Sequence, residues 1–479
     1  MDLNYLDNIT GLEFEKFALT ILEYEARKLG KKIVLNEETS EYLHSHYLGA
    51  TDYRLHIFDA IAPEGLYDNK ITFFTIKFFK RKSDEMYSQI GQLVHRCRDF
   101  MSQSDLHVRG YDNIKFIFIT NIPNEFKHNR TFADSELFQL WSFDDLLDRS
   151  KLYPFEYNAF IELAISKNTS KRGADELRKM TTIVPDSDID MQNSNLIDEL
   201  KNEINRKGIS LVLGTGISMD YNNNLSWNEL TNRMYSELPK SKQFNDGNNA
   251  FSILGDDNIS KSQYSKHNLG NSFPTIIYKL LYPTPKVYSI GLTSLDECAN
   301  LVLKKNSSTN NGIKKVLTYN YDNYFEQALS ARFLKYNILF MDDDSENLFL
   351  SIFHLHGYLP EDIKSPLKEK YAKALVLSES DYFDSYSDSS NWLVAVQLTT
   401  FKNDVCLFVG NSIKDFNERR LLNRTKQKNK SHFAIMDSKG LGGNDLSKIH
   451  SFFFYELNVR IIWTDDTKEI PDILRRINT

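Results

Sequence analysis

The sequence has few cysteines and no long apolar run. Its 479 residues include three cysteines, Cys97, Cys298 and Cys406, which lie far apart in apolar or helical contexts. They are too few for a four-thiolate zinc site or a disulfide framework, so we predict buried, reduced thiols. No apolar stretch approaches the ~18 residues that a membrane-spanning helix needs. The opening "MDLNYLDNITGLEFEKF" lacks the basic and apolar regions of a secretion signal. We therefore expect a cytoplasmic protein with no membrane partner.

The chain also lacks an excess of basic charge. Its 58 Lys and Arg stand against 65 Asp and Glu, which gives a formal net charge of −7. Such a balance provides no general attraction to nucleic acid or anionic membranes, so either partner would need a local patch. Apolar residues make up 41% of the chain, which is enough for substantial cores. A length of about 150 residues per domain allows roughly two to four domains.

Apolar patterning predicts two α/β domains joined by a linker. In residues 1–165, the helix-like "GLEFEKFALTILEYEARKLG" precedes the strand-like "YRLHIFDAIA", "KITFFTIKFF" and "NIKFIFITNI". Residues 166–193 are polar and turn-forming, as in an exposed connector. In residues 194–479, helical stretches alternate with "ISLVLGTG", "IKKVLTYNY", "NLFLSIFHLHG", "ALVLSE", "DVCLFVGNS", "SHFAIMDS" and "VRIIWTDD". Nearly continuous apolar strands between helices predict a doubly wound, Rossmann-like parallel sheet covered on both faces.

Ligands of doubly wound sheets bind beyond the carboxyl ends of the strands, and two of these ends carry glycine followed by serine. In "LVLGTGISMDY", Gly214 and Gly216 allow close backbone approach to a phosphate, although a tight packing turn explains them equally well. Ser218 adds a hydroxyl. The segment "DVCLFVGNSIKDF" repeats the pattern with a glycine and a serine, and then places Asp415 where it either caps a helix or holds a ribose hydroxyl.

Two other strand ends carry polar residues. In "VLTYNYDNYFEQAL", Asn320 and Asp322 follow the strand, and taken alone Asp322 is more commonly a helix cap. In "SIFHLHGYLP", His354 and His356 alternate with apolar residues and face one side of the strand. No cysteine or acid lies at a spacing suited to a shared metal. His356, directly before a glycine, is better placed as a base with a pKa near neutrality, and His354 as an inner, hydrogen-bonded histidine.

In order and spacing these segments resemble the SIR2-like (sirtuin-type) NAD-binding domain, particularly the branch found in bacterial antiphage defence proteins. The glycine motif is matched by "GTGIS" followed by "LSWNEL", and the Thr-x-Asn-Tyr-Asp motif by "TYNYD", with Glu326 behind it. The His-Gly motif is matched at His356, the acidic-aromatic stretch by "LSESDYFDSY", and Gly-x-Ser-x-x-Asp by "GNSIKD". The resemblance covers roughly 195–477. Thr215 departs from the alanine that is usual in the family.

The resemblance implies a function and a set of roles. NAD would be the substrate, Asn320 would orient the nicotinamide ribose or an attacking water, His356 would be the general base, and Asp322 would support the pocket. The implied cofactor-binding residues are Gly214, Thr215, Gly216 and Ser218 at the pyrophosphate, and Gly410, Ser412 and Asp415 at the adenosine side. Protein-deacetylating sirtuins carry a four-cysteine zinc module that three cysteines cannot build. The resemblance therefore implies NAD hydrolysis to nicotinamide and ADP-ribose, without zinc.

The amino-terminal domain resembles the Mrr-like, PD-(D/E)xK restriction-endonuclease fold across about residues 9–150. Asp59 and Lys77 match the metal-binding Asp and the Lys of that fold, and Glu15 matches its helix acid. Thr75 stands where a carboxylate or Gln is expected, so metal-dependent cleavage is not predicted, with Asp52 as a substitute ligand. A solvated or phosphate-contacting Lys77 is an equal alternative. We expect a degenerate module that senses, binds nucleic acid or oligomerises.

Together these interpretations predict an antiphage defence effector that hydrolyses NAD on sensing infection. The expected partners are NAD, a phage-derived protein or nucleic-acid trigger, and further copies of the chain in a homo-oligomer. The alternative is a nuclease-fold protein that binds or cleaves DNA and whose SIR2-like domain binds NAD or ADP-ribose as a regulatory ligand.

Overall fold

The computed structural model describes residues 6, 8–35, 37–47, 58–80, 84–104, 111–122, 136–222, 225–245, 247–255, 257–283, 288–307, 312–342, 349–362, 369–388, 391–427 and 430–479. They form two compact units. Unit 1 comprises Met1–Asn195 and Leu441–Glu456, and unit 2 comprises Leu196–Gly440 and Leu457–Thr479. Unit 1 is therefore built from two separate stretches of chain.

A mixed five-stranded sheet forms the centre of unit 1 as described. Its strands, in spatial order, are β1 (Val34–Leu35), β2 (Ala60–Ala62), β3 (Ile71–Lys77), β4 (Ile114–Thr120) and β5 (Phe138–Trp141). The pairs β1–β2 and β2–β3 are antiparallel, whereas β3–β4 and β4–β5 are parallel. Of the predicted strand at 53–62, residues 53–57 lie outside the described residues.

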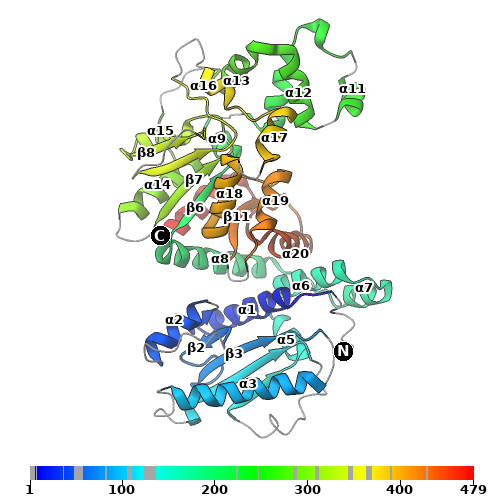
Figure 1. Ribbon diagram of the computed structural model, residues 1–479, viewed down its shortest axis with the longest axis vertical. Coiled ribbons are helices and arrows are strands. Elements are labelled where there is room, and N and C mark those ends of the chain that lie inside the picture. Colours follow the sequence, from blue (N-terminus) through cyan, green and yellow to red (C-terminus); the bar gives the residue numbers. More distant parts are fainter. Residues whose placement is uncertain are drawn as a thin grey trace. The chain divides into compact units, whose positions relative to one another are not determined.

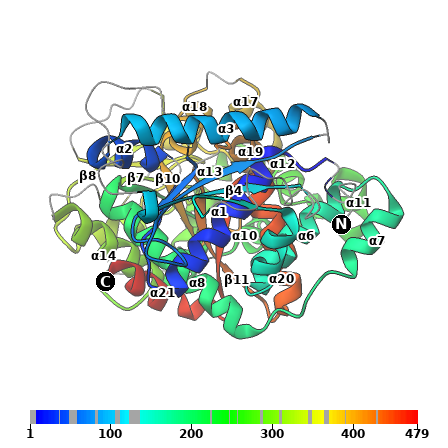
Figure 2. The same ribbon diagram turned by 90° about the horizontal axis from the view of Figure 1, so that it is seen from below.

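Helices cover both faces of this sheet. On one face, α1 (Gly11–Lys28), α5 (Phe143–Ser150) and α6 (Pro154–Lys167) share a core with the strands, and on the other face lies α3 (Asp84–Gln103), as Figures 1 and 2 show. A capping box between Thr10 and Glu13 starts α1, because each residue satisfies a backbone N–H of the other.

The second stretch of unit 1 adds α20 (Gly443–Phe452), which packs against α6. The ring of His450 lies 5.2 Å from that of Phe155, and Asn444 accepts the backbone N–H of Val184 at 3.0 Å. Further helices described in this unit include α2 (Glu37–His46), α7 (Lys171–Arg178) and the first half of α8 (Asp186–Arg206). The stretch interpreted as a linker, residues 166–193, thus contains α7 and the start of α8.

An all-parallel sheet forms the centre of unit 2. In the described part of this unit its seven strands are β6 (Ile209–Leu213), β7 (Ile313–Thr318), β8 (Tyr336–Leu339), β9 (Leu350–His354), β10 (Val405–Val409), β11 (His432–Asp437) and β12 (Val459–Thr464). Their spatial order is β12-β11-β10-β6-β7-β9-β8. On one side of β6 lie β7, β9 and β8, and on the other side lie β10, β11 and β12. This order confirms the predicted α/β, Rossmann-like fold class, with its reversal point between β6 and β10.

Helices again pack on both faces of this sheet. The second half of α8 joins α14 (Ser294–Ser307) and α21 (Ile470–Asn478) in one core, while α18 (Trp392–Asn403) places Phe401 against Phe408 on the other face, their ring centroids 6.0 Å apart (Figure 1). A helical insert consists of α10 (Trp227–Ser236), α11 (Gly247–Leu254), α12 (Asn258–Leu269) and α13 (Phe273–Leu281). The helices around the strand ends are α9 (Thr215–Asn222), α15 (Tyr324–Ser330), α16 (Glu369–Lys373), α17 (Glu379–Tyr386) and α19 (Phe416–Arg424).

Two strand predictions for unit 2 differ from the structure. The segment "ALVLSE" was predicted as a strand, and this is wrong: Leu375 and Val376 are buried without joining the sheet. The N–H of Val376 donates instead to the backbone oxygen of His356. The short edge strand β8 was not predicted, because three of its four residues are only half-buried and show no apolar run.

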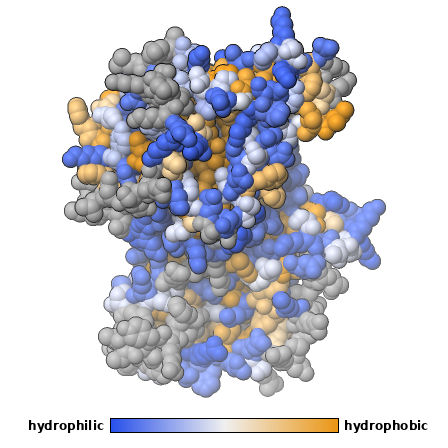
Figure 3. All heavy atoms as spheres, turned by 45° about the horizontal axis from the view of Figure 1, so that its top comes forward, coloured by the Kyte–Doolittle hydropathy of each residue, from blue (hydrophilic) through white to orange (hydrophobic). Residues whose placement is uncertain are grey.

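The surface of the molecule mixes polar and apolar residues. On the face shown in Figure 3, hydrophobic residues lie in small patches among hydrophilic ones. The most exposed apolar side chains include Ile253 in α11 and Phe416 in α19. None of the helices in the described ranges is both long and apolar enough to cross a lipid bilayer.

Candidate functional site

The carboxyl ends of four neighbouring strands meet where the strand order of unit 2 reverses. Leu213, the last residue of β6, is in register with Val409 of β10 on one side and with Thr318 of β7 on the other. Thr318 in turn is in register with His354, which ends β9. The segments that follow these strands therefore start side by side, and they carry the residues predicted from the sequence.

Asn320 is held at this edge by three hydrogen bonds, one to the end of β7 and two to the segment that follows β6. Its Nδ2 donates to the backbone oxygen of Gly214 at 3.1 Å and to Oγ of Ser218 at 3.0 Å, and its N–H donates to Oγ1 of Thr318 at 3.1 Å. The residue is 4% exposed, and its Oδ1 has no hydrogen-bond partner among the described residues. The backbone oxygen of Gly214 can only accept a hydrogen bond, so the side-chain atom that contacts it is Nδ2. Among the described residues, the atom without a partner is therefore Oδ1.

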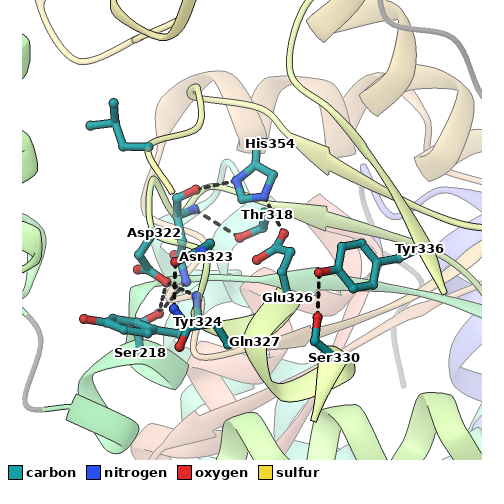
Figure 4. A network of polar contacts seen from close by, with 12 residues as sticks. Ser218, Thr318, Asp322, Asn323, Tyr324, Glu326, Gln327, Ser330, Tyr336 and His354 are labelled. Atoms are coloured by element: carbon teal, nitrogen blue, oxygen red, sulfur yellow. Dashed lines mark hydrogen bonds and ion pairs between the residues drawn. The ribbon is translucent and has the colours of Figure 1, made fainter. Parts of the chain in front are cut away.

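Asp322 lies beside Asn320 and shares Ser218 with it. The hydroxyl of Ser218 donates to Oδ1 of Asp322 at 3.1 Å, and the same oxygen accepts the N–H of Tyr324, the first residue of α15, at 3.2 Å. Figure 4 shows these side chains close together. Burial raises the pKa of Asp322 to about 6, and the nearby Glu326 adds to this rise. Asp322 thus binds the first N–H of α15, whose N-cap is Asn323 and not Asp322 as the capping explanation predicted, and it also contacts the side chain that holds Asn320.

His354 is buried behind Asn320, as expected for an inner histidine. Its Nδ1 lies 2.9 Å from the backbone oxygen of Asn320, and its Nε2 lies 2.6 Å from Oε1 of Glu326. Figure 4 shows the imidazole directed toward Glu326, which α15 supplies. The sequence predicted the burial of His354 but not its contact with the loop of Asn320.

His356 is enclosed by aromatic rings. It lies just beyond β9, is 6% exposed, and has its Nε2 3.4 Å from the hydroxyl of Tyr386. The rings of Tyr319 and Tyr382 approach its imidazole edge to face, at 5.0 and 5.3 Å. Burial lowers the pKa of His356 to about 4, against the opposing charge of Asp415. This differs from the pKa near neutrality expected from the sequence, and it leaves the imidazole neutral at physiological pH.

A directional hydrogen-bond chain reaches His356. Tyr319 donates to Oε1 of Gln397 at 2.7 Å, and Nε2 of Gln397 donates to the hydroxyl oxygen of Tyr386 at 3.3 Å. The hydroxyl of Tyr386 lies 3.4 Å from Nε2 of His356, and its proton is available to that nitrogen in the tautomer that carries the imidazole proton on Nδ1. Sequence reasoning did not single out Tyr386 or Gln397, although Tyr386 ends the acidic-aromatic stretch "LSESDYFDSY".

The helical insert holds the start of α17, the helix that carries Tyr382 and Tyr386. Lys266 of α12 forms an ion pair with Asp381 and donates to Oγ of Ser378 at 3.3 Å. Gln263, also on α12, accepts from the backbone N–H and the hydroxyl of Ser380 at 3.1 and 3.0 Å. These contacts help to keep α17 in place beside His356.

The predicted glycines bring two loops into backbone contact. The N–H of Gly214 donates to Val409, and that of Gly216 donates to Gly410, both at 3.0 Å. A Cβ on Gly214 would lie 2.4 Å from the oxygen of Gly410, and one on Gly216 would lie 2.8 Å from its Cα. Gly410 itself has φ +63°, in the left-handed region. The packing-turn explanation is therefore sufficient for these glycines, and Thr215 begins α9 between the first two.

The remaining predicted residues of unit 2 lie at the start of α19. Asp415 is its N-cap and accepts the N–H groups of Asn417 and Glu418 at 2.7 and 3.1 Å. Of its two proposed roles, the structure displays the helix cap. Ser412 is exposed before it. Burial raises the pKa of Glu418 to about 8, and Asn411 donates to this carboxyl at 2.8 Å.

The candidate nuclease residues of unit 1 lie in and beside its sheet. Asp59, directly before β2, accepts the N–H of Ile76 in β3 at 2.7 Å. Thr75 and Glu15 are buried, whereas Lys77 is exposed at the end of β3. Asp52 lies outside the described residues. Among the residues that the structure describes, no group of three or more His, Cys, Asp or Glu is arranged to hold a metal ion.

Comparison with known proteins agrees with the position of this site. Residues 314–462 match the model of a family described as a SIR2-like domain. No curated protein matches the chain. The chain thus carries a SIR2-like domain in its C-terminal part, and the matched stretch includes Asn320, Asp322, His356 and Asp415. Gly214 and Ser218, at the start of α9, precede the matched stretch in sequence and contact it in the fold.

Proposed function

We propose that unit 2 is an NAD glycohydrolase that splits NAD into nicotinamide and ADP-ribose. The observation that carries this proposal is the buried, unpaired Oδ1 of Asn320, fixed at the sheet edge where doubly wound folds bind nucleotides. A buried acceptor without a donor is unfavourable in the absence of a ligand, and a ribose hydroxyl or a water molecule would supply that donor. The SIR2-like match over residues 314–462 supports NAD as the compound that does so.

The reaction needs placement of a nucleophile and acceptance of one proton. The bond between C1′ of the ribose and the pyridinium nitrogen breaks, and its electron pair leaves with neutral nicotinamide. The oxygen of water bonds to C1′, and its proton passes to Nε2 of His356. Burial lowers the pKa of His356 to about 4, so its imidazole is neutral, and in the tautomer with the proton on Nδ1 the nitrogen Nε2 can take this proton. Asn320 would orient the ribose or the water through Oδ1, while Asp322 and Ser218 hold its amide.

The hydroxyl of Tyr386 lies where the substrate would have to approach His356. Its hydroxyl occupies Nε2, the nitrogen that the reaction uses, and Asn320 and His356 are both almost fully buried. A water molecule or ribose hydroxyl at Nε2 would take the place of the Tyr386 hydroxyl. In the alternative function, NAD or ADP-ribose binds as a regulatory ligand and is not cleaved; the occupied Nε2 is the observation that favours it.

We also propose that the protein acts in antiphage defence, with unit 1 as a sensing, nucleic-acid-binding or oligomerisation module. The support is the order of motifs in unit 2 together with the restriction-endonuclease-like pattern of unit 1. Recognition of a phage-derived protein or nucleic acid would then be followed by loss of cellular NAD, in a homo-oligomer of this chain.

An NAD consumption assay on the purified full-length chain tests the proposal. NAD, nicotinamide and ADP-ribose are quantified by chromatography, with and without phage lysate or DNA, for the wild type and for Asn320→Ala. The expected result is equimolar release of nicotinamide and ADP-ribose by the wild type alone. Binding of ADP-ribose by calorimetry without turnover under any of these conditions would support the regulatory alternative.

A further inference from the structure

His354 and Glu326 form a buried pair directly behind Asn320, and the proposed chemistry does not use either residue. His354 ends β9, Glu326 lies in the first turn of α15, and Asn320 leaves β7. The side chains of the pair are only 1% and 3% exposed. Three elements of the sheet edge are therefore connected through one imidazole.

The partner of Nδ1 determines where the imidazole carries its first proton. The backbone oxygen of Asn320, 2.9 Å from Nδ1, can only accept a hydrogen bond, so Nδ1 must carry a proton. Nε2 lies 2.6 Å from Oε1 of Glu326, a distance that requires one more proton between the two atoms. That proton belongs either to an imidazolium facing a carboxylate or to a carboxylic acid facing a neutral imidazole. In both states Nδ1–H continues to donate to Asn320.

This bond completes the fixation of Asn320. Gly214 and Ser218 hold its side-chain NH₂, Thr318 holds its backbone N–H, and His354 holds its backbone oxygen. Every polar group of Asn320 except Oδ1 thus has a partner in the fold. A residue held through both its main chain and its side chain can direct one remaining atom with little reorganisation.

We propose that His354 and Glu326 are positioning residues that hold the main chain of Asn320 so that its Oδ1 faces the ribose of NAD. Nδ1–H of His354 makes the contact that matters, and Glu326 keeps the imidazole turned toward Asn320. This inference deepens the proposed function and rests on it.

Two substitutions of His354 separate positioning from a merely structural role. The amide nitrogen of Asn lies near the place of Nδ1, so His354→Asn can keep the donor to Asn320. The longer Gln reaches the place of Nε2, so His354→Gln can keep the contact with Glu326 and loses the donor. We expect kcat to fall by about 50-fold in His354→Gln, as for a misplaced reacting group. In His354→Asn it should fall by no more than about 5-fold, the size of an ordinary lost hydrogen bond.

Further variants complete the series. Glu326→Gln still hydrogen-bonds Nε2 and should retain most of the turnover, whereas Glu326→Ala should behave like His354→Gln. Ser330→Ala serves as the matched control, because Ser330 lies on the same helix as Glu326 but is exposed. Its hydroxyl contacts the hydroxyl of Tyr336. If His354→Asn does not fold, the double variant His354→Asn, Glu326→Gln removes the buried carboxylate left without its histidine. Equal losses in the Asn and Gln variants, at matched thermal stability, would overturn the proposal.

A spectroscopic measurement tests the inference without NAD turnover. The chain contains 11 histidines, and in protein labelled with ¹⁵N-histidine the ring signal lost in His354→Gln belongs to His354. A protonated, hydrogen-bonded Nδ1 is expected, and an unprotonated Nδ1 would overturn the inference. If the wild type does not cleave NAD, the proposed function fails by itself. The two His354 variants are then compared by ADP-ribose affinity, where equal losses count against positioning.

Discussion

The sheets of the two units treat the polar residues at their strand ends differently. In unit 1, the carboxyl of Asp59 accepts a backbone N–H of the neighbouring strand, Thr75 is buried, and Lys77 is turned to solvent. In unit 2, the amide of Asn320 is held by the backbone oxygen of Gly214 and the hydroxyl of Ser218, and one of its buried atoms has no hydrogen-bond partner among the described residues.

The difference teaches how to separate a structural polar residue from a functional one. A polar group whose hydrogen bonds go to its own backbone stabilises the fold, and its presence says little about ligands. A buried group held firmly through all its atoms but one requires another explanation, because the unpaired atom is costly to bury. Asn320 in unit 2 meets this criterion, whereas the carboxyl of Asp59 in unit 1 accepts a backbone N–H of its own sheet.

The largest expected effect comes from the unpaired atom itself. Asn320→Ala removes Oδ1 and should lower the rate of NAD cleavage by about 10³-fold, comparable to the loss of a preorganised polar group in other active sites. Release of nicotinamide by the purified chain measures this effect, with Ser330→Ala as control. Turnover within about 3-fold of the wild type is too small a change for a lost catalytic contact, and it would show that Asn320 takes no part in the reaction.

The next effect tests whether the glycines of unit 2 serve packing. Gly214→Ala places a Cβ 2.4 Å from the oxygen of Gly410 and should destabilise the fold by about 1–3 kcal/mol, as overpacking does. Gly440→Ala is the comparison variant for backbone strain without a clash: its φ of +72° makes a side chain unfavourable by about 1–2 kcal/mol, but nothing lies within 4 Å of an added Cβ. Chemical unfolding compares the two. A smaller loss in Gly214→Ala than in Gly440→Ala would show that the loops yield easily, and would make phosphate contact the stronger explanation.

A moderate effect concerns the buried acid beside the site. Burial raises the pKa of Glu418 from its ordinary value of 4.5 to about 8. Between these values the folded state holds the proton that the unfolded state has released, so stability falls as pH rises through this window. Glu418→Gln cannot titrate and should unfold about 2–4 °C higher than the wild type at pH 9, and at the same temperature at pH 5.

Melting curves across this pH range measure the effect of Glu418→Gln. Glu369→Gln provides the exposed control, because the side chain of Glu369 is 78% exposed. Parallel pH profiles for the wild type and Glu418→Gln would show that Glu418 ionises normally in the folded protein.

The smallest effect is expected in unit 1. The wild type should not cleave DNA with magnesium or manganese, because Thr75 offers a neutral hydroxyl where a charged ligand is needed. If unit 1 binds nucleic acid, Lys77→Ala should reduce the salt dependence of binding by about one ion, with Lys171→Ala on exposed α7 as control. Metal-dependent cleavage that is lost in Asp59→Ala would show that unit 1 also holds a functional site.

Much of the fold of unit 2 could be predicted, because buried parallel strands are continuous apolar runs. The run "ALVLSE" misled because Leu375 and Val376 are buried by packing and not by strand pairing. The edge strand β8 was missed because edge residues are only half-buried. Periodicity reports burial, and burial has more than one structural cause.

The candidate site could be predicted only as a set of strand ends. The sequence places Asn320 after a strand, but not the contact of its amide with Gly214, because the two residues are separated by 106 positions. In the same way, the position of Glu326 on a helix does not indicate that it faces His354. Contacts of this kind depend on strand order and register, which local patterns do not encode.

The division of unit 1 into two stretches has a consequence for synthesis on the ribosome. The helix α20 packs against α6, yet it follows β11 in the sequence, so β6 to β11 of unit 2 are made before unit 1 has all its parts. Domains commonly fold in the order in which they emerge, but here the first unit must wait for residues 441–456. A fragment ending at Asn195 would lack the ring of His450 beside Phe155 and the side chain of Asn444 at Val184. Exposed apolar surface on α6 would then make the nascent amino-terminal part a natural client for chaperones.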